Sequence, residues 1–372
     1  MQGFPYTMLP KPSLEVDLPF GSEKLEEVQR YGRHLQATYR WLRRSVQKAE
    51  GGSAAYYCPG LGWSQAYPET TGYLIPTLLE LKSYLPREDV EGLAVKLGDW
   101  LLKIQKSDGS WPGGLYTPGD EGGQSSVFNT SQILLGLVSV YRFDRQDKWL
   151  DAATRGANWL VGSLEDPQEW AANDYEADLT PSYYARAVWP ILEVWRETGK
   201  DSLKWKAISI LDHIYSQKHK DGSFRKWGFD GGRAAYTHTI AYTIRGFWES
   251  ARILGEWNRW IDPVSEGLER LRRQAEMRWG KLPGIYGSGW EGENAFSCLT
   301  GNSQLAICML EWEKEDQDIR IVNAAAKLVD YVCSRQKIRF PLSGIRGGVA
   351  GSAPWWGSYM RCRYPNWAAK FH

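Results

Sequence analysis

The chain has 372 residues, of which 45 are Lys or Arg and 44 are Asp or Glu, so its formal net charge is +1. Neither sign of charge forms a long block, which excludes the broad basic surface that nucleic-acid binding requires. No run approaches 18 apolar residues, so no membrane-spanning segment is predicted. The 20 Trp and 20 Tyr residues either fill a helical core as bulk or offer flat faces to sugar rings or isoprenoid chains.

The five cysteines form no CxxC pair, and their irregular spacing indicates reduced thiols without a metal template. P-loop, GxGxxG and HExxH motifs are also absent from the sequence, so we expect no cofactor and no metal. Residues 1–23 are read as an N-terminal extension without the features of a signal peptide. These observations favour a cytoplasmic protein; they leave its oligomeric state open.

Helical periodicity recurs along the chain in alternating charged and apolar segments. A charged helix is expected over 24–50 and an apolar one over 67–82. The same alternation returns, with further apolar helices starting near these residues: 128, 182, 237, 298 and 366. Repeats of roughly 54–68 residues that cannot bury a face alone must stack or close on one another. We therefore predict an all-α, (α/α)6 toroid as one domain over 24–372, in which the last inner helix stops after one or two turns.

The connections between the predicted helices differ in length. Those from an apolar helix to the next charged helix are short, such as SYLPRE and RFDRQ, whereas the reverse connections are long and rich in Gly, Trp, Tyr and Asp. Antiparallel hairpins place all the long loops at one end of the barrel, beside the N-termini of the inner helices. A ligand pocket is expected there, and the free N–H groups of those helices favour an anionic ligand.

This pattern resembles the α/α-toroid superfamily, which includes six-hairpin glycosidases, polysaccharide lyases and epimerases, terpenoid cyclases and protein prenyltransferases. The segment QKSDGSW (105–111) matches the Q-x3-G-x-W element of the cyclases. In the superfamily this element closes a hairpin, so it implies the fold more than the reaction. GWSQAYPETTGY (62–73), SCLTGNSQ (297–304) and YPNWAAKF (364–371) look like segments of polysaccharide-associated bacterial toroid proteins. The DxDD and DDxxD motifs of terpenoid enzymes are missing.

Two carboxylates at the rim would suit a glycoside hydrolase, which needs an opposed acid and base or nucleophile. Glu69 lies in the first turn of an apolar helix, where it can also act as a simple helix cap. Asp178, Glu176 or Asp230 could supply the second carboxylate.

Proton abstraction from C5 of a uronic acid is the main prediction, because Tyr, His, Asn and Arg outnumber acids at the rim. His238 with Tyr236 or Tyr184 could supply the base and the acid. Protonation from the opposite face would give epimerisation, and loss of the C4 substituent would give elimination. The alternative for His238 is a buried histidine satisfied by a neighbouring helix. Further along the same helix, Arg245 and Glu249 are spaced for a salt bridge.

Substrate-binding residues are expected among the amides, cations and aromatic rings of the loop end. A carboxylate of the substrate could be held by an arginine or by amide donors. The candidates are Arg186, Asn129, Asn302, Trp63, Trp111, Trp227, Trp290, Trp356, Tyr359 and Arg346. The predicted partner is an oligo- or polysaccharide. A glycoside hydrolase, a terpenoid-cyclase-like enzyme and a non-catalytic glycan-binding toroid remain alternatives to the lyase or epimerase.

Overall fold

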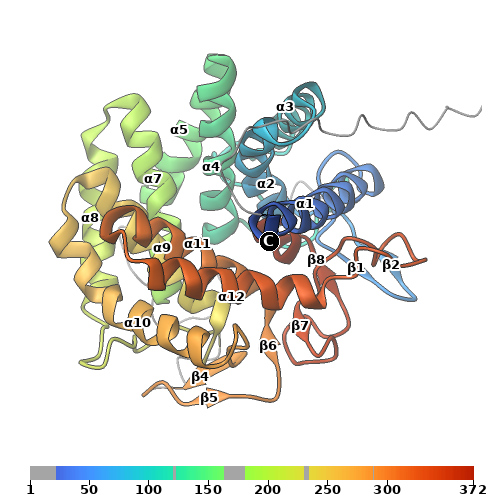
Figure 1. Ribbon diagram of the computed structural model, residues 1–372. Helices are drawn as coiled ribbons and strands as arrows, with labels where there is room; N and C mark the ends of the chain where they lie inside the picture. The colour runs from blue at the N-terminus through green and yellow to red at the C-terminus, as the bar shows by residue number, and fades with distance from the viewer. Residues whose placement is uncertain (1–21, 120–122, 163–180, 230–233, 288) are drawn as a thin grey trace, which may run out of the picture.

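The computed structural model describes residues 22–119, 123–162, 181–229, 234–287 and 289–372. Its helices form two concentric layers (Figure 1). The outer helices are α1 (Ser22–Lys48), α3 (Arg87–Lys103), α5 (Asp147–Gly162), α8 (Asp201–Tyr215), α10 (Trp257–Met277) and α12 (Ile319–Arg335). The inner helices are α2 (Pro68–Glu80), α4 (Val127–Asp144), α7 (Ala185–Thr198), α9 (Thr237–Leu254), α11 (Leu299–Asp316) and α13 (Asn366–Phe371). Short 3-10 turns follow α2 at Leu81–Ser83 and precede α7 at Ser182–Tyr184.

The inner helices close into a ring. Each packs on the next along the chain, and α13 packs on both α11 and α2. Glycines allow this close approach: a Cβ added at Gly136 would lie 2.3 Å from the carbonyl oxygen of Gly72, and one at Gly246 would lie 2.1 Å from the carbonyl carbon of Ala185. The (α/α)6 toroid predicted from the helix repeat is therefore confirmed.

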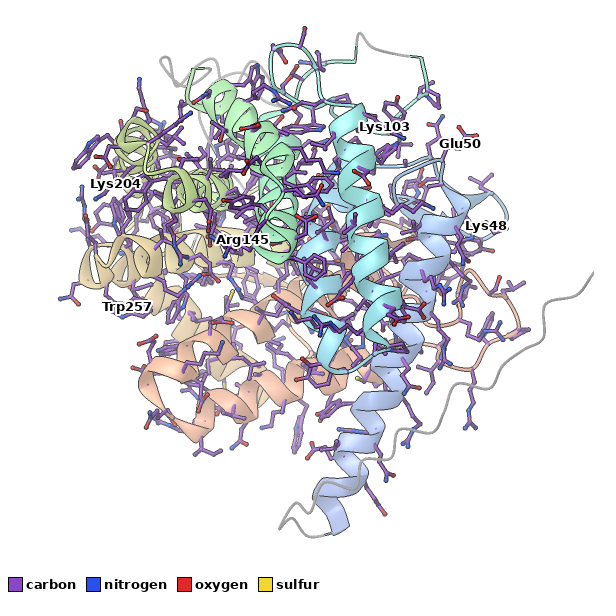
Figure 2. The ribbon with its side chains drawn as sticks, turned by 90° about the horizontal axis from the view of Figure 1, so that it is seen from above. Lys48, Glu50, Lys103, Arg145, Lys204 and Trp257 are labelled. Atoms are coloured by element: carbon purple, nitrogen blue, oxygen red, sulfur yellow. The ribbon has the colours of Figure 1, made fainter. Side chains whose placement is uncertain are left out.

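Tight turns connect each inner helix to the following outer helix. Four of the inner helices end at a residue in the left-handed conformation, namely Arg145 after α4, Gly199 after α7, Gly255 after α9 and Gln317 after α11. Such C-caps satisfy the last carbonyls and reverse the chain within a few residues. Figure 2 shows the layers from above, with Arg145 at the turn after α4 and Trp257 at the start of α10. The short connections therefore gather at one end of the barrel, as the sequence predicts.

The long loops at the other end carry short antiparallel strands. One sheet has the order β2 (Gly62–Trp63), β1 (Tyr56–Cys58) and β8 (Tyr364–Pro365), so the first long loop pairs with the last. A second has the order β3 (Ala234–Tyr236), β4 (Ile285–Gly287) and β5 (Gly292–Glu293). A third pairs β6 (Ser297–Cys298) with β7 (Ser352–Ala353). These pairings fix the loops to one another around the mouth of the barrel.

The sixth hairpin is incomplete, as the sequence suggests. Helix α13 has 6 residues, whereas the other inner helices have between 13 and 18. Outer helix α1 packs directly on α13, and Figure 1 shows the C-terminus beside α1. Within the described ranges, no helix combines the length and apolar character needed to cross a bilayer.

Candidate functional site

Glu69 is a buried acid at the loop end of the inner barrel. It follows Pro68, the first residue of α2, and its exposed fraction is 8%. Burial raises the pKa of Glu69 to about 7, although a hydrogen bond from Tyr67, the positive charge of Arg186 and the nearby Tyr73 hydroxyl act in the opposite direction. A carboxyl group with this pKa is about half protonated at neutral pH and can donate a proton to a substrate.

His238 lies in the first turn of α9 and is 2% exposed. Its ring packs 4.3 Å from the ring of Tyr359 and 5.7 Å from that of Tyr236, measured between centroids. Its Nδ1 lies 3.7 Å from the Sγ of Cys298, the N-cap residue of α11. Burial lowers the pKa of His238 to about 3, so its imidazole is neutral and weakly basic at neutral pH. Sequence reasoning does not reveal this loss of basicity.

An aromatic path connects His238 with Glu69. The ring of Tyr359 lies against His238, and its hydroxyl accepts a hydrogen bond of 2.7 Å from the Nε1 of Trp367. The ring of Trp367 in turn lies 6.1 Å from that of Tyr67, whose hydroxyl also interacts with Glu69. The fold therefore brings the predicted residues His238, Tyr236, Tyr359 and Glu69 to one region. Sequence reasoning missed Trp367 as part of this path.

The other predicted catalytic residues are placed differently. Tyr184 is fully buried, and its ring packs against Phe128 and Tyr183, with centroid distances of 6.2 and 5.1 Å. It therefore belongs to the packed wall of the barrel. Asp178 and its alternatives Glu176 and Asp230 lie outside the described residues.

Two of the three expected carboxylate-binding residues lie near Glu69. Asn129 accepts a hydrogen bond of 3.4 Å from the Tyr67 hydroxyl. Arg186 is 4% exposed, donates from Nε to the Gln132 side chain and stacks over the ring of Tyr242.

Asn302 instead holds the main chain after α10, because its Nδ2 donates to the carbonyl of Gly280 at 2.7 Å. It is completely buried, and its role in substrate binding stays a prediction.

Three of the predicted sugar-stacking tryptophans are buried within the hairpin loops. Trp111 is 0% exposed, and its Nε1 donates to the carbonyl of Leu101 on α3. Trp227 is 1% exposed and packs edge-on against Trp290, which donates to the carbonyl of Asp221. These side chains stabilise the loops and offer no free face. Their contacts close the hairpins, and their contact with substrate stays a prediction.

The remaining candidates lie at the periphery. Trp63 packs on Trp41 and Tyr57, with ring centroids 5.0 and 5.3 Å away. Arg346 is exposed, and its carbonyl accepts a hydrogen bond from Arg44 on α1, so it lies at the outer edge of the barrel, and its contact with substrate stays a prediction. Trp356 is 57% exposed and is the expected sugar-stacking tryptophan that keeps a free face.

A cavity of about 700 Å³ lies at the short-loop end of the inner barrel, opposite the end at which the sequence predicts the pocket. Its walls are the C-terminal halves of the inner helices together with α1, which faces the cavity because α13 is short. Ion pairs line it, including the predicted Arg245–Glu249 pair at 2.6 Å and Arg142–Glu193 at 2.6 Å. Tyr73, about one helical turn after Glu69 in α2, also lines this cavity, as does Arg186 of α7.

No protein-family model matches the chain, and no curated protein matches its sequence. Solved structures nevertheless share its fold. A heparin-specific unsaturated glucuronyl hydrolase has 13% identity and a TM-score of 0.71, with 92% of this chain and 95% of that chain covered. Cellobiose 2-epimerase from Bacillus thermoamylovorans B4167 has 13% identity and a TM-score of 0.72, with 94% and 98% covered.

The unsaturated glucuronyl hydrolase of Bacillus sp. GL1 has 15% identity and a TM-score of 0.64, with 92% of this chain and 94% of that chain covered. At these identities the similarity establishes a common fold. The chain therefore has the α/α-toroid architecture of six-hairpin enzymes, in agreement with the resemblance identified from its sequence.

Proposed function

We propose that the chain is a glycoside hydrolase that acts on a uronate-containing oligosaccharide, with Glu69 as the general acid. The observation that carries this proposal is the pKa of Glu69, which burial raises to about 7. A protonated carboxyl is what the departing glycosidic oxygen requires, and enzymes commonly raise the pKa of a catalytic acid toward neutrality by burial. Asp178 or Asp230 is the proposed second carboxylate.

The choice of a uronate rests on two further points. Several structures with this fold are unsaturated glucuronyl hydrolases, and one of these, from Streptococcus agalactiae, is a complex with dGlcA-GalNAc6S. In this chain, Arg186 carries a positive charge close enough to Glu69 to lower its pKa, so the region favours an anionic ligand. The partner expected for the site is therefore an acidic oligosaccharide.

A second candidate is an epimerase that uses His238 as the base. The close packing of His238 against Tyr359 and the shared fold with a cellobiose 2-epimerase favour it. Its weakness is electrostatic, since an imidazole with a pKa of about 3 accepts protons poorly at neutral pH. The protonated carboxyl of Glu69 is better matched to its task, which ranks hydrolysis first.

The test is a panel of unsaturated uronyl disaccharides, their saturated counterparts and cellobiose. Hydrolysis is measured as released reducing sugar, and epimerisation as incorporation of solvent deuterium beside the carbonyl. We expect hydrolysis of a uronide that Glu69→Gln lowers by a factor of about 10²–10⁴. The matched control is Glu291→Gln, which changes an exposed acid of the same rim and should leave the rate unchanged.

The pH profile supplies an independent criterion. Because the acid must be protonated, kcat/KM should fall as pH rises above about 7. Deuterium incorporation that depends on His238 and survives Glu69→Gln would overturn the hydrolase proposal in favour of the epimerase.

A further inference from the structure

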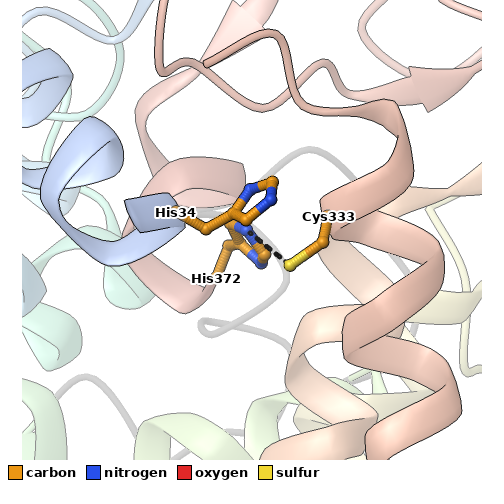
Figure 3. A group of neighbouring side chains, drawn as sticks. All are labelled: His34, Cys333 and His372. Carbon is orange, nitrogen blue, oxygen red and sulfur yellow. Dashed lines mark hydrogen bonds between the residues drawn. The ribbon is translucent and has the colours of Figure 1, made fainter. Parts of the chain in front are cut away.

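Three potential metal ligands meet where the first and last hairpins of the toroid join. His34 comes from outer helix α1, Cys333 from outer helix α12 and His372 from the residue after α13. One ligand atom from each residue lies within 4.8 Å of those of the other two. Figure 3 shows the three side chains directed toward a common point, with the hydrogen bond between Cys333 and His372 drawn.

The spacing is close to that of a tetrahedral site. A zinc ion at its usual distances from sulfur and nitrogen holds those ligand atoms roughly 3.3–3.6 Å apart. The Sγ of Cys333 and the Nε2 of His372 are 3.8 Å apart, so this pair is nearly in position. Closing the separations that extend to 4.8 Å requires shifts of about 1 Å, which side-chain rotation can supply.

Gln336 orients His34 for coordination. The Gln336 Nε2 donates to the Thr38 hydroxyl at 2.7 Å and to the Gly347 carbonyl at 2.8 Å, which fixes the direction of the amide. Its Oε1 lies 2.6 Å from His34 Nδ1 and can only accept, so Nδ1 carries the proton. The Nε2 of His34 is then left with a free lone pair. Metal-binding histidines are typically held in this way by a partner on the other ring nitrogen.

The chemistry of the donors indicates the kind of ion. Two imidazoles and one thiolate form a borderline-soft set that suits zinc, and three protein ligands leave a fourth position for water or another ligand. The Nδ1 atom of His372 is buried and has no hydrogen-bond partner among the described residues, so protein contacts leave its ring incompletely satisfied. His372 also lines the 700 Å³ cavity, which connects the cluster with the interior of the barrel.

We propose that His34, Cys333 and His372 bind one zinc-type divalent cation, which links α1, α12 and α13. These elements belong to the first and sixth hairpins, and α13, with 6 residues, offers less helix for packing on α11 and α2 than the longer inner helices offer to their neighbours. A bound ion joins residues separated by about 300 positions in sequence, so it constrains the unfolded chain strongly and stabilises ring closure.

The experiment uses the full chain, stripped with a chelator and titrated with Co²⁺ and then Zn²⁺. Co²⁺ should bind at one equivalent and produce the thiolate-to-cobalt charge-transfer band, which Zn²⁺ then removes. At a hundredfold excess over Kd, Zn²⁺ should raise the midpoint of thermal unfolding by roughly 3–5 °C. Substrate is not involved, so the result is independent of the proposed function.

Variants assign the ion to this cluster. Cys333→Ser should abolish the charge-transfer band and weaken Zn²⁺ binding at least about tenfold. Cys58→Ser, at a partly exposed thiol in β1, is the matched control and should bind like the unchanged protein. His34→Gln provides a second variant on the outer helix in case Cys333→Ser fails to fold. Absence of stoichiometric Co²⁺ binding, or a band that persists in both variants, would overturn the proposal.

Discussion

The substitution Glu69→Gln should remove a pH-dependent penalty from the stability of the protein. In the folded chain the pKa of Glu69 is raised from 4.5 to about 7, chiefly because the ionised carboxylate is buried. Below pH 4.5 the group is protonated in both the folded and the unfolded states, and no penalty exists. As pH rises from 4.5 through 7, the unfolded state releases its proton first, so the folded state loses stability relative to it.

The size of this penalty follows from the two pKa values. Each unit of difference corresponds to 1.36 kcal/mol, so a rise from 4.5 to about 7 amounts to about 3 kcal/mol once both states are ionised. Glutamine has nearly the same shape and does not ionise. The free energy of unfolding of Glu69→Gln, minus that of the unchanged protein, should therefore increase by about 3 kcal/mol between pH 4 and pH 8.

Urea denaturation followed by circular dichroism at several pH values measures this difference. Each pH requires both proteins, because the other titrating groups then cancel in the subtraction. Glu291→Gln serves as the control, since this exposed acid should show a difference that hardly changes with pH. A flat difference for Glu69→Gln as well would show that the carboxyl ionises normally, and the argument for Glu69 as a neutral-pH acid would fail.

Two further predictions concern the inner barrel. Glu249→Gln should lower the free energy of unfolding at pH 7 by about 3 kcal/mol, because it leaves the largely buried guanidinium of Arg245 without the carboxylate that lies 2.6 Å away. Urea denaturation measures this loss, and a loss below about 1 kcal/mol would contradict the prediction. Gly246→Ala should cost about 1–3 kcal/mol, because the added methyl group would collide with the α7 backbone. Gly92→Ala, in an open part of α3, should instead stabilise by about 0.5–1 kcal/mol, and urea denaturation measures both glycine variants.

The toroid could be predicted from the sequence because the pattern of apolar residues that produces it repeats along the chain. Each inner helix is apolar over most of its surface, each outer helix on one face, and the unequal loops fix which ends gather together. The element QKSDGSW also has the role that the resemblance implies: Gln105 donates to the Gly109 and Ala152 carbonyls, and Trp111 is buried against α3. These are local or regularly repeated signals.

The candidate site could be predicted only in part. His238, Tyr236, Tyr359 and Glu69 are brought together because all lie at the loop end, which the hairpin order determines. The burial of each group, however, depends on packing by distant segments. Trp367 covers Tyr359 and Tyr67 from the sixth hairpin, and no spacing rule connects it to α2 or α9.

The expectation that the chain lacks a metal site has a similar origin. Sequence motifs for metals depend on ligands a few residues apart, whereas His34, Cys333 and His372 are joined only by the closure of the ring. The proposed site thus arises from the topology, and its ligands carry no local signature.

The pKa of a buried acid is lowered at one end of the inner barrel and raised at the other, and Arg186 lies between the two ends. At the short-loop end, the cavity lets acids and arginines pair, so Glu249 has a lowered pKa beside Arg245 and Arg252. At the loop end, Glu69 is buried among aromatic rings, and its pKa is raised. Arg186 stacks on Tyr242 and Phe371 and has no carboxylate partner among the described side chains. Its positive charge therefore lowers the pKa of Glu69 from a distance, without forming the salt bridge that would keep the acid ionised. This arrangement explains how one barrel can hold an acid of lowered pKa at one end and an acid of raised pKa at the other.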